Sequence, residues 1–179
     1  GDLPTPEERF ELTKLAFRDF PEAEISDMEL RRGGESYTSD TVEELAREYP
    51  GAELWLVIGT DMLTRFERWH EFRSILAGAA LAVLPRNEGE LPEIERCAAR
   101  FEALYGARVR IIDAAPLPMS SSEMRDMLVA RRGADVLDGE VYARIIRLRD
   151  YGAKPQLDWL RERAYAYLKP KPGPPGDNS

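Results

Sequence analysis

Residues 54–59 read LWLVIG, and this stretch decides the fold class. Five apolar residues in a row, closed by a glycine, are typical of a strand that is buried on both faces of a parallel sheet. Parallel strands cannot be joined by a tight hairpin and need a longer, usually helical, connection. We therefore expect this strand to belong to a sheet whose other strands alternate with helices along the chain.

The flanking sequence agrees with that expectation. Further strands are predicted at Ala80–Leu84 and Ala107–Ile112, with helices at Arg65–Leu76 and Pro92–Tyr105 between the strands. This alternation indicates right-handed βαβ units. The sequence predicts an α/β fold, a Rossmann-like doubly wound parallel sheet with helices on both faces and a C-terminal helical extension. The other predicted elements are a strand at Ala23–Leu30 and helices at Pro6–Phe20, Ser39–Tyr49, Ser121–Arg132, Gly139–Asp150 and Pro155–Leu168.

The length of 179 residues fits one domain with an appendage. We predict a main domain over residues 1–152 and a helical extension over residues 153–168. The extension has an apolar stripe that either packs on the parent domain or forms a homodimer contact. The tail, residues 169–179, reads KPKPGPPGDNS and is predicted to be disordered.

Composition excludes several classes of protein. The net charge of −8 argues against a general binder of nucleic acid or membrane surfaces. No apolar run approaches the roughly 20 residues of a membrane span, and the first residues do not resemble a signal peptide. Cys97 is the only cysteine, so no intrachain disulfide can form and a cytoplasmic location is expected.

Candidate ligand-binding residues follow the predicted strands. In open α/β sheets, ligands bind beyond the carboxyl ends of the strands. The turn after Leu30, Gly59-Thr60-Asp61, the Pro85-Arg86 turn and residues 118–122 all lie at such ends. Their coincidence predicts a nucleotide-type site.

Met119–Arg125 reads MSSSEMR and opens a predicted helix. Unpaired N–H groups at a helix start form a site for phosphate, and the guanidinium of Arg125 suits phosphate oxygens. The alternative interpretation is structural, because Ser120 and Glu123 also match a capping box.

Two further motifs leave a similar choice open. Asp61 is placed to accept hydrogen bonds from ribose hydroxyls, but it could instead cap the next helix. Phe66 and Trp69 lie three residues apart, which is more often a core pattern than a ligand platform. Trp69 stands among charged residues, however, and a ring at the rim of a cleft would suit stacking on a flat heteroaromatic ligand.

Three blocks, taken in order, resemble bacterial nicotinate-nucleotide adenylyltransferases, which belong to the nucleotidyltransferase superfamily with the HxGH signature. The blocks are GxSYTxDT at residues 34–41, IGTD at residues 58–61 with Phe66 and Trp69, and MSSSxMR at residues 119–125. The family's usual last block is SSTxIR, so Ser122 and Met124 are mild substitutions. The likeness covers roughly residues 5–152.

The resemblance implies transfer of the AMP part of ATP to nicotinate mononucleotide, giving deamido-NAD and pyrophosphate. Mg²⁺ would accompany ATP. No covalent intermediate is needed, so positioning and charge stabilisation carry the reaction. The implied nicotinate mononucleotide residues are Ser36, Tyr37, Thr38 and Trp69. The implied ATP residues are Gly59, Asp61, Arg86, Ser120, Ser121, Ser122 and Arg125, of which Arg125 stabilises phosphate charge.

The sequence departs from the family in one respect. Members open with a strand, a Gly-rich turn and an HxGH motif, whereas the single histidine here, His70, lies outside any such pattern. The catalytic residues are therefore unknown, and His70 is expected on the surface or at a rim. We expect the sequence to be a fragment of a longer enzyme. The alternatives are a non-catalytic nucleotide-binding or regulatory relative, or a sister enzyme that uses nicotinamide mononucleotide.

Overall fold

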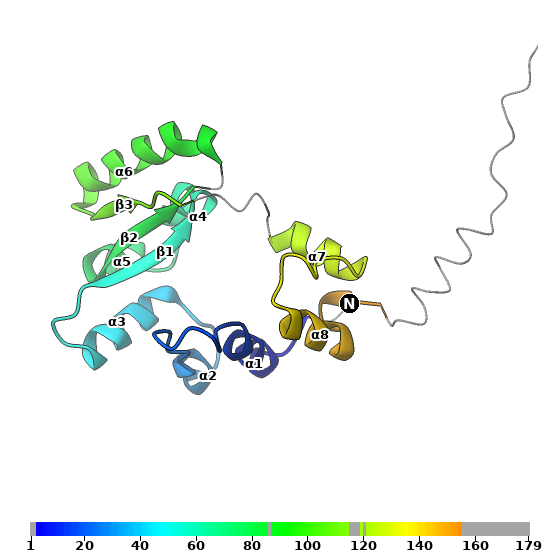
Figure 1. The fold of residues 1–179 in the computed structure, drawn as a ribbon. Helices are drawn as coiled ribbons and strands as arrows, with labels where there is room; N and C mark the ends of the chain where they lie inside the picture. The colour runs from blue at the N-terminus through cyan, green and yellow to red at the C-terminus, as the bar shows by residue number, and fades with distance from the viewer. Residues whose placement is uncertain (1–2, 86, 115–118, 120, 155–179) are drawn as a thin grey trace, which may run out of the picture. The chain divides into compact units, whose positions relative to one another are not determined.

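The computed structural model describes residues 3–85, 87–114, 119 and 121–154. The chain divides into two compact units (Figure 1). We call Ser26–Met119 the sheet unit, and Gly1–Ile25 together with Ser120–Ser179 the helical unit. Each is described by itself. The predicted extension at residues 153–168 falls largely, and the tail at 169–179 entirely, outside the described residues.

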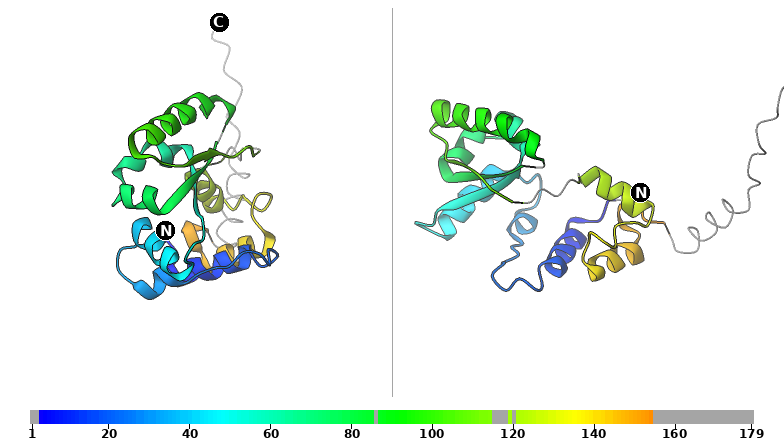
Figure 2. Two further views of the ribbon diagram at one scale, coloured as in Figure 1. Left: turned by 90° about the vertical axis from the view of Figure 1, so that its left-hand side faces the viewer. Right: turned by 45° about the horizontal axis from the view of Figure 1, so that its top comes forward.

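The sheet unit contains three parallel strands in the order β1-β2-β3 (Figure 2). They are β1 (Leu54–Gly59), β2 (Ala79–Leu84) and β3 (Val109–Ile111). The register places Leu56 opposite Leu81, and Leu81 opposite Val109. Helices flank the sheet, so the predicted Rossmann-like α/β class is confirmed.

One face of this sheet carries the core of the unit. Ile58, Leu81 and Val83 alternate onto the same face and are at most 3% exposed. They pack in one cluster with Phe66 and Phe101, which are fully buried. The cluster draws further side chains from the helices that join the strands, namely Leu63, Ile75, Leu76 and Ile94.

The opposite face is only partly covered. Trp55 is 41% exposed and Val57 is 60% exposed, whereas β2 is buried almost throughout. The prediction that β1 is buried on both faces is therefore wrong. Trp55 and Val57 lie on the same face as Ala80 and Ala82 of β2, which are buried. Cover on this face is therefore incomplete at β1, which among the described residues pairs on one side only, with β2. A second layer of helices on this face stays a prediction.

The helices of the sheet unit follow the predicted pattern with two exceptions. Their bounds are α2 (Met28–Arg32), α3 (Thr38–Glu48), α4 (Thr60–Thr64), α5 (Phe72–Gly78) and α6 (Leu91–Tyr105), with 3₁₀ turns η1 (Phe66–Arg68) and η2 (Glu88–Glu90). The predicted strand at Ala23–Leu30 is wrong, because its second half forms α2. A helical turn lets Asp27 pair with Arg31, and Gly33, at φ 67°, ends the helix.

The predicted helix at Arg65–Leu76 is broken. It consists of η1, a turn through Trp69, His70 and Glu71, and then α5. Glu71 has a left-handed backbone, with φ 48°, which no glycine announces in the sequence. The break matters because it removes Trp69 from a regular helix and places it in a turn.

The helical unit consists of α1 (Pro6–Ala16), α7 (Ser121–Val129), α8 (Gly139–Leu148) and the 3₁₀ turn η3 (Asp150–Gly152). Thr5 and Glu8 form the predicted capping box at the start of α1. The helix ends at Ala16 rather than near Phe20, and Phe17 is 45% exposed. A small cluster holds the unit together and includes Leu12, Leu128, Val141 and Ile145.

Charged groups also stabilise the helical unit. Arg18 donates to both carboxylate oxygens of Asp138 at 2.9 and 3.0 Å. Asp138 also caps α8 by accepting from the backbone N–H groups of Glu140 and Val141. The Arg18 bond, followed by the backbone donors, lowers the pKa of Asp138 to about 2.

Asp150 has the opposite environment. It is only 6% exposed, and its Oδ2 has no hydrogen-bond partner within the described part of the chain. Burial, and then the negative charge of Glu8, raise the pKa of this carboxyl, while Arg144 acts in the other direction.

No helix in the described residues has both the length and the apolar character that a membrane span requires.

Candidate functional site

The carboxyl end of β1 leads directly into α4. Gly59 is the last residue of β1 and occupies the N-cap position of α4, so Asp61 lies in the first helical turn and is exposed. The alternative interpretation of Asp61 as the cap of this helix is therefore wrong. Asp61 instead lies just beyond the strand end, where the fold class places ligands.

Thr60 connects this strand end to the next one. Its side chain is buried, and its hydroxyl donates to Glu90 at the start of α6. Asn87 donates to the other oxygen of Glu90 at 2.8 Å. From the sequence we predicted only a polar loop at residues 85–91, and we did not identify Glu90 as a candidate. A threonine directly after a buried strand, which needs a partner for its hydroxyl, was the available signal.

Tyr37 lies at the start of α3 and makes two side-chain contacts. Its ring stacks on His70 with the centroids 4.1 Å apart and the planes 30° apart. Its hydroxyl donates to Glu35, and this bond raises the pKa of Tyr37. The stack brings the loop of the SYT motif beside the turn that follows η1. His70 is exposed, as expected of a surface or rim histidine.

Trp69 is the second aromatic residue of this region. Its ring stacks on Phe66 at 4.9 Å, and it is half-buried while Phe66 is fully buried. The pair therefore divides between the two interpretations: Phe66 belongs to the core and Trp69 lies at its edge. Trp69 directly precedes His70, the residue on which Tyr37 stacks.

Glu67 fixes the 3₁₀ turn that precedes Trp69. Its carboxylate accepts from Arg100 at 3.1 and 2.7 Å and from the hydroxyl of Tyr105 at 2.6 Å. The Arg100 bond, followed by the Tyr105 bond, lowers the pKa of Glu67. These contacts join η1 to α6.

The start of α3 differs from the start of α1. Tyr37 occupies the N-cap position of α3, and within the described residues no side chain caps this helix. Ser36 is exposed and Thr38, the first helical residue, is half-buried. The first backbone N–H groups of α3 therefore lie beside Tyr37 without a side-chain acceptor, which is an arrangement suited to an anion.

The third motif lies in the helical unit. α7 begins at Ser121, and Ser121, Ser122 and Arg125 are all exposed. Arg125 donates from Nε to the carbonyl of Ser121 at 3.0 Å, which directs its guanidinium along the first turn. Ser120 and Arg86 lie outside the described residues, so the capping box of Ser120 and Glu123 stays a prediction. Of the predicted site residues, the sheet unit holds Ser36, Tyr37, Thr38, Gly59, Asp61 and Trp69, and the helical unit holds Ser121, Ser122 and Arg125.

Metal-ligating side chains do not gather in the described residues, where no group of three or more His, Cys, Asp or Glu could hold an ion. Asp61 is the one predicted site residue with a carboxylate.

Comparison with known proteins gives a consistent result. Residues 2–127 match the sequence model of the family described as cytidylyltransferase-like. A probable nicotinate-nucleotide adenylyltransferase of Herpetosiphon aurantiacus is 35% identical, over 69% of this chain and 61% of the relative. One of Marinobacter nauticus is 31% identical, over 83% of this chain and 74% of the relative. One of Geobacter metallireducens is 41% identical over 48% of this chain and 39% of the relative. The chain thus spans less than two thirds of the length of several relatives that it matches.

Proposed function

Because the chain belongs to the cytidylyltransferase-like family, we propose that it transfers the AMP part of ATP to nicotinate mononucleotide, giving deamido-NAD and pyrophosphate. Relatives at 28–41% identity carry the name probable nicotinate-nucleotide adenylyltransferase, which supports this activity. The reaction is an in-line attack of the mononucleotide phosphate on the α-phosphorus of ATP. It requires positioned reactants and neutralised phosphate charge rather than a covalent intermediate.

The observation that carries this proposal is the start of α3 beside two aromatic residues. Tyr37 and Trp69 would contact the flat nicotinate ring, and the uncapped N–H groups of Thr38 and its neighbours would receive the ring carboxylate. Ser36 would add a hydroxyl at the same place. An amide in place of the carboxylate carries no charge and gains less from a helix start, which favours nicotinate over nicotinamide.

Each unit, taken by itself, carries residues that we assign to ATP. Gly59 and Asp61 would contact the nucleotide sugar, Ser120, Ser121, Ser122 and Arg125 the phosphates, and Arg86 the region of the adenine. A single carboxylate fits an Mg²⁺ ion that arrives with ATP and is held mostly by phosphate oxygens and water. Such an ion would neutralise charge on the phosphates.

Binding and turnover test the proposal separately. Titration with nicotinate mononucleotide should quench tryptophan fluorescence, and Trp69→Leu should remove the response while Trp55→Phe, on the exposed face of β1, keeps it. Nicotinamide mononucleotide should bind more weakly. Equal binding of the two ligands would contradict the role of the α3 start. Pyrophosphate release with ATP and Mg²⁺ then tests the reaction itself.

The phosphate role of Arg125 has its own test. Arg125→Ala should weaken ATP binding about ten-fold, because a charge-assisted hydrogen bond is lost. Nicotinate mononucleotide binding should stay unchanged. Arg132→Ala, at an exposed arginine after α7, is the matched control. An equal loss for both ligands would reject the assignment.

A further inference from the structure

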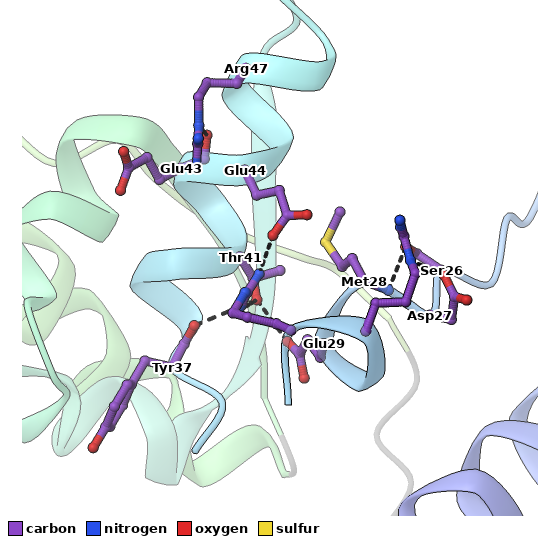
Figure 3. A network of polar contacts seen from close by, with 11 residues as sticks. Ser26, Asp27, Met28, Glu29, Tyr37, Thr41, Glu43, Glu44 and Arg47 are labelled. Carbon is purple, nitrogen blue, oxygen red and sulfur yellow. Dashed lines mark hydrogen bonds and ion pairs between the residues drawn. The ribbon is translucent and has the colours of Figure 1, made fainter. Parts of the chain in front are cut away.

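Thr41 is a residue of the SYTxDT block to which the proposed function gives no role. It lies on α3, one turn after Tyr37, and it is the centre of a polar network (Figure 3). Its hydroxyl donates to Glu29 of α2 at 2.8 Å and accepts from Nη1 of Arg32 at 3.3 Å. The same oxygen lies 3.5 Å from the carbonyl oxygen of Tyr37.

Arg32 completes the link between the two helices. It is the last residue of α2, and its Nη2 donates to Glu44 of α3 at 2.6 Å. Only 23% of the Arg32 side chain is exposed, which is less than for the arginines of the other ion pairs that the described residues of the sheet unit form. Because the guanidinium is a planar fork, it can reach Thr41 and Glu44 at once, which a lysine ammonium cannot do with the same geometry.

The loop between these helices has little support of its own. Gly33 and Gly34 both have positive φ, at 67° and 71°, and no atom lies within 4 Å of the place where either would carry a Cβ. The loop ends at Tyr37, the N-cap residue of α3, and Thr41 lies one turn further on. The contacts of Thr41 therefore bear on the first turn of α3, which carries the tyrosine ring. The Tyr37 ring itself contacts the turn after η1 by stacking on His70.

We propose that Arg32 and Thr41 are positioning residues that hold α2 against α3 and thereby present Tyr37 to the mononucleotide ring. The expected effect on mononucleotide binding rests on the proposed function. The orientation of Tyr37, however, can be measured without any ligand.

The orientation test uses the only histidine in the chain. The imidazole protons of His70 give one set of NMR signals, and the stacked Tyr37 ring shifts them from the positions of a free histidine. Thr41→Val keeps the branched shape and removes the hydroxyl, and Arg32→Gln removes the fork. Both variants should move the His70 signals toward free-histidine values, in the direction that Tyr37→Leu defines.

A matched control lies next to Arg32. Arg31 pairs with Asp27 on the same helix at 2.8 Å and is 66% exposed, so Arg31→Gln should leave the His70 signals in place. A clamp that only stabilises the fold would lower the melting temperature without moving the His70 signals of the folded protein. Unmoved signals in Thr41→Val and Arg32→Gln, beside a clear shift in Tyr37→Leu, would therefore overturn the proposal.

The binding test completes the argument. In Thr41→Val the Kd for nicotinate mononucleotide should rise about five-fold, because Tyr37 occupies its binding orientation for a smaller fraction of the time, while the Kd for ATP stays the same. Equal rises for both ligands, or none, would overturn the positioning role. If the unsubstituted chain does not bind the mononucleotide, the proposed function fails, and the NMR result shows separately whether the clamp orients Tyr37.

Discussion

The two units of the chain differ in the size of their apolar cores. The sheet unit packs fully buried side chains such as Phe66 and Phe101 against one face of a parallel sheet. The helical unit has a smaller apolar cluster, and it adds Asp138, which caps α8 and pairs with Arg18. Apolar burial depends little on pH or salt, whereas ion pairs and buried carboxyls depend on both. Both units contain ion pairs, but the buried carboxyl of Asp150 belongs to the helical unit, so we expect the stability of that unit to depend more on pH.

The difference extends to the predicted site. In the sheet unit, the motif residues stand at the end of a strand and at the start of α3, next to a packed core. In the helical unit, Ser121, Ser122 and Arg125 stand on the exposed first turn of α7. Substitutions in the core of the sheet unit should thus disturb mononucleotide binding, while the α7 residues can be changed with little effect on stability.

The largest effect is expected from Phe66→Ala. Removal of a fully buried ring should cost about 3–5 kcal/mol of unfolding free energy. Leu104→Ala, at a 62% exposed position on α6, should cost little. Denaturant unfolding measures both values. Hydrogen exchange should show the loss of protection in the sheet unit, and an equal loss in α1 and α8 would contradict the division into two stability units.

Gly78→Ala should have the next largest effect. A Cβ at Gly78 would lie 2.7 Å from Cγ1 of Val42, a side chain that is stiff at χ1, so α3 and α5 must move apart. We expect a loss of about 1–3 kcal/mol. The double variant with Val42→Ala should recover part of it, because the truncated side chain leaves room. No recovery would show that the glycine is needed for another reason.

Asp150→Asn should stabilise the helical unit at neutral pH. Burial raises the folded-state pKa of Asp150, so the folded protein favours the protonated carboxyl. The stability gained from this preference is fully present below the unfolded-state pKa near 3.8. That stability is lost as the pH rises through the folded-state pKa. The asparagine variant should lose this part of the pH dependence, as melting temperatures between pH 4 and 8 would record. An unchanged profile would mean that water hydrates the Asp150 carboxyl in the folded protein.

Asp138 should show the opposite pH dependence. Its folded-state pKa is about 2, so its stabilisation is complete above the unfolded-state value near 3.8 and is lost as the pH falls toward 2. Arg18→Gln should flatten the decline in melting temperature between pH 4 and 2. High salt should have a similar, weaker effect, since the pair is partly exposed. A steeper decline in the variant would be inconsistent with this account.

The sequence predicted the parts of the fold that depend on local patterns. The apolar run of β1 and the cap at Thr5 lie where they were expected. The segment before Gly33 was assigned the wrong structure, because a short alternation of apolar residues does not show that Asp27 and Arg31 pair across a helical turn. The exposure of Trp55 and Val57 depends on which strands are neighbours, and that information is not local.

The candidate site divides in the same way. Tyr37, Asp61 and Trp69 could be chosen from motifs and from their place after predicted strands. His70 and Glu90 could not, because their contacts with Tyr37 and Thr60 join segments about thirty residues apart in sequence. The break in the helix at Glu71 decides where Trp69 lies, and a left-handed glutamate leaves no sequence signal.

The discontinuity of the helical unit bears on the order of folding. In the sheet unit, strands that are consecutive in the chain are neighbours in the sheet, so most of its contacts close short loops. By contrast, α1 packs on α8, and the whole of Ser26–Met119 lies between them. Closing that long loop costs more entropy and takes place later. During synthesis we expect the sheet unit to fold first, while α1, although made before the sheet unit, stays accessible to chaperones and proteases until α8 has left the ribosome.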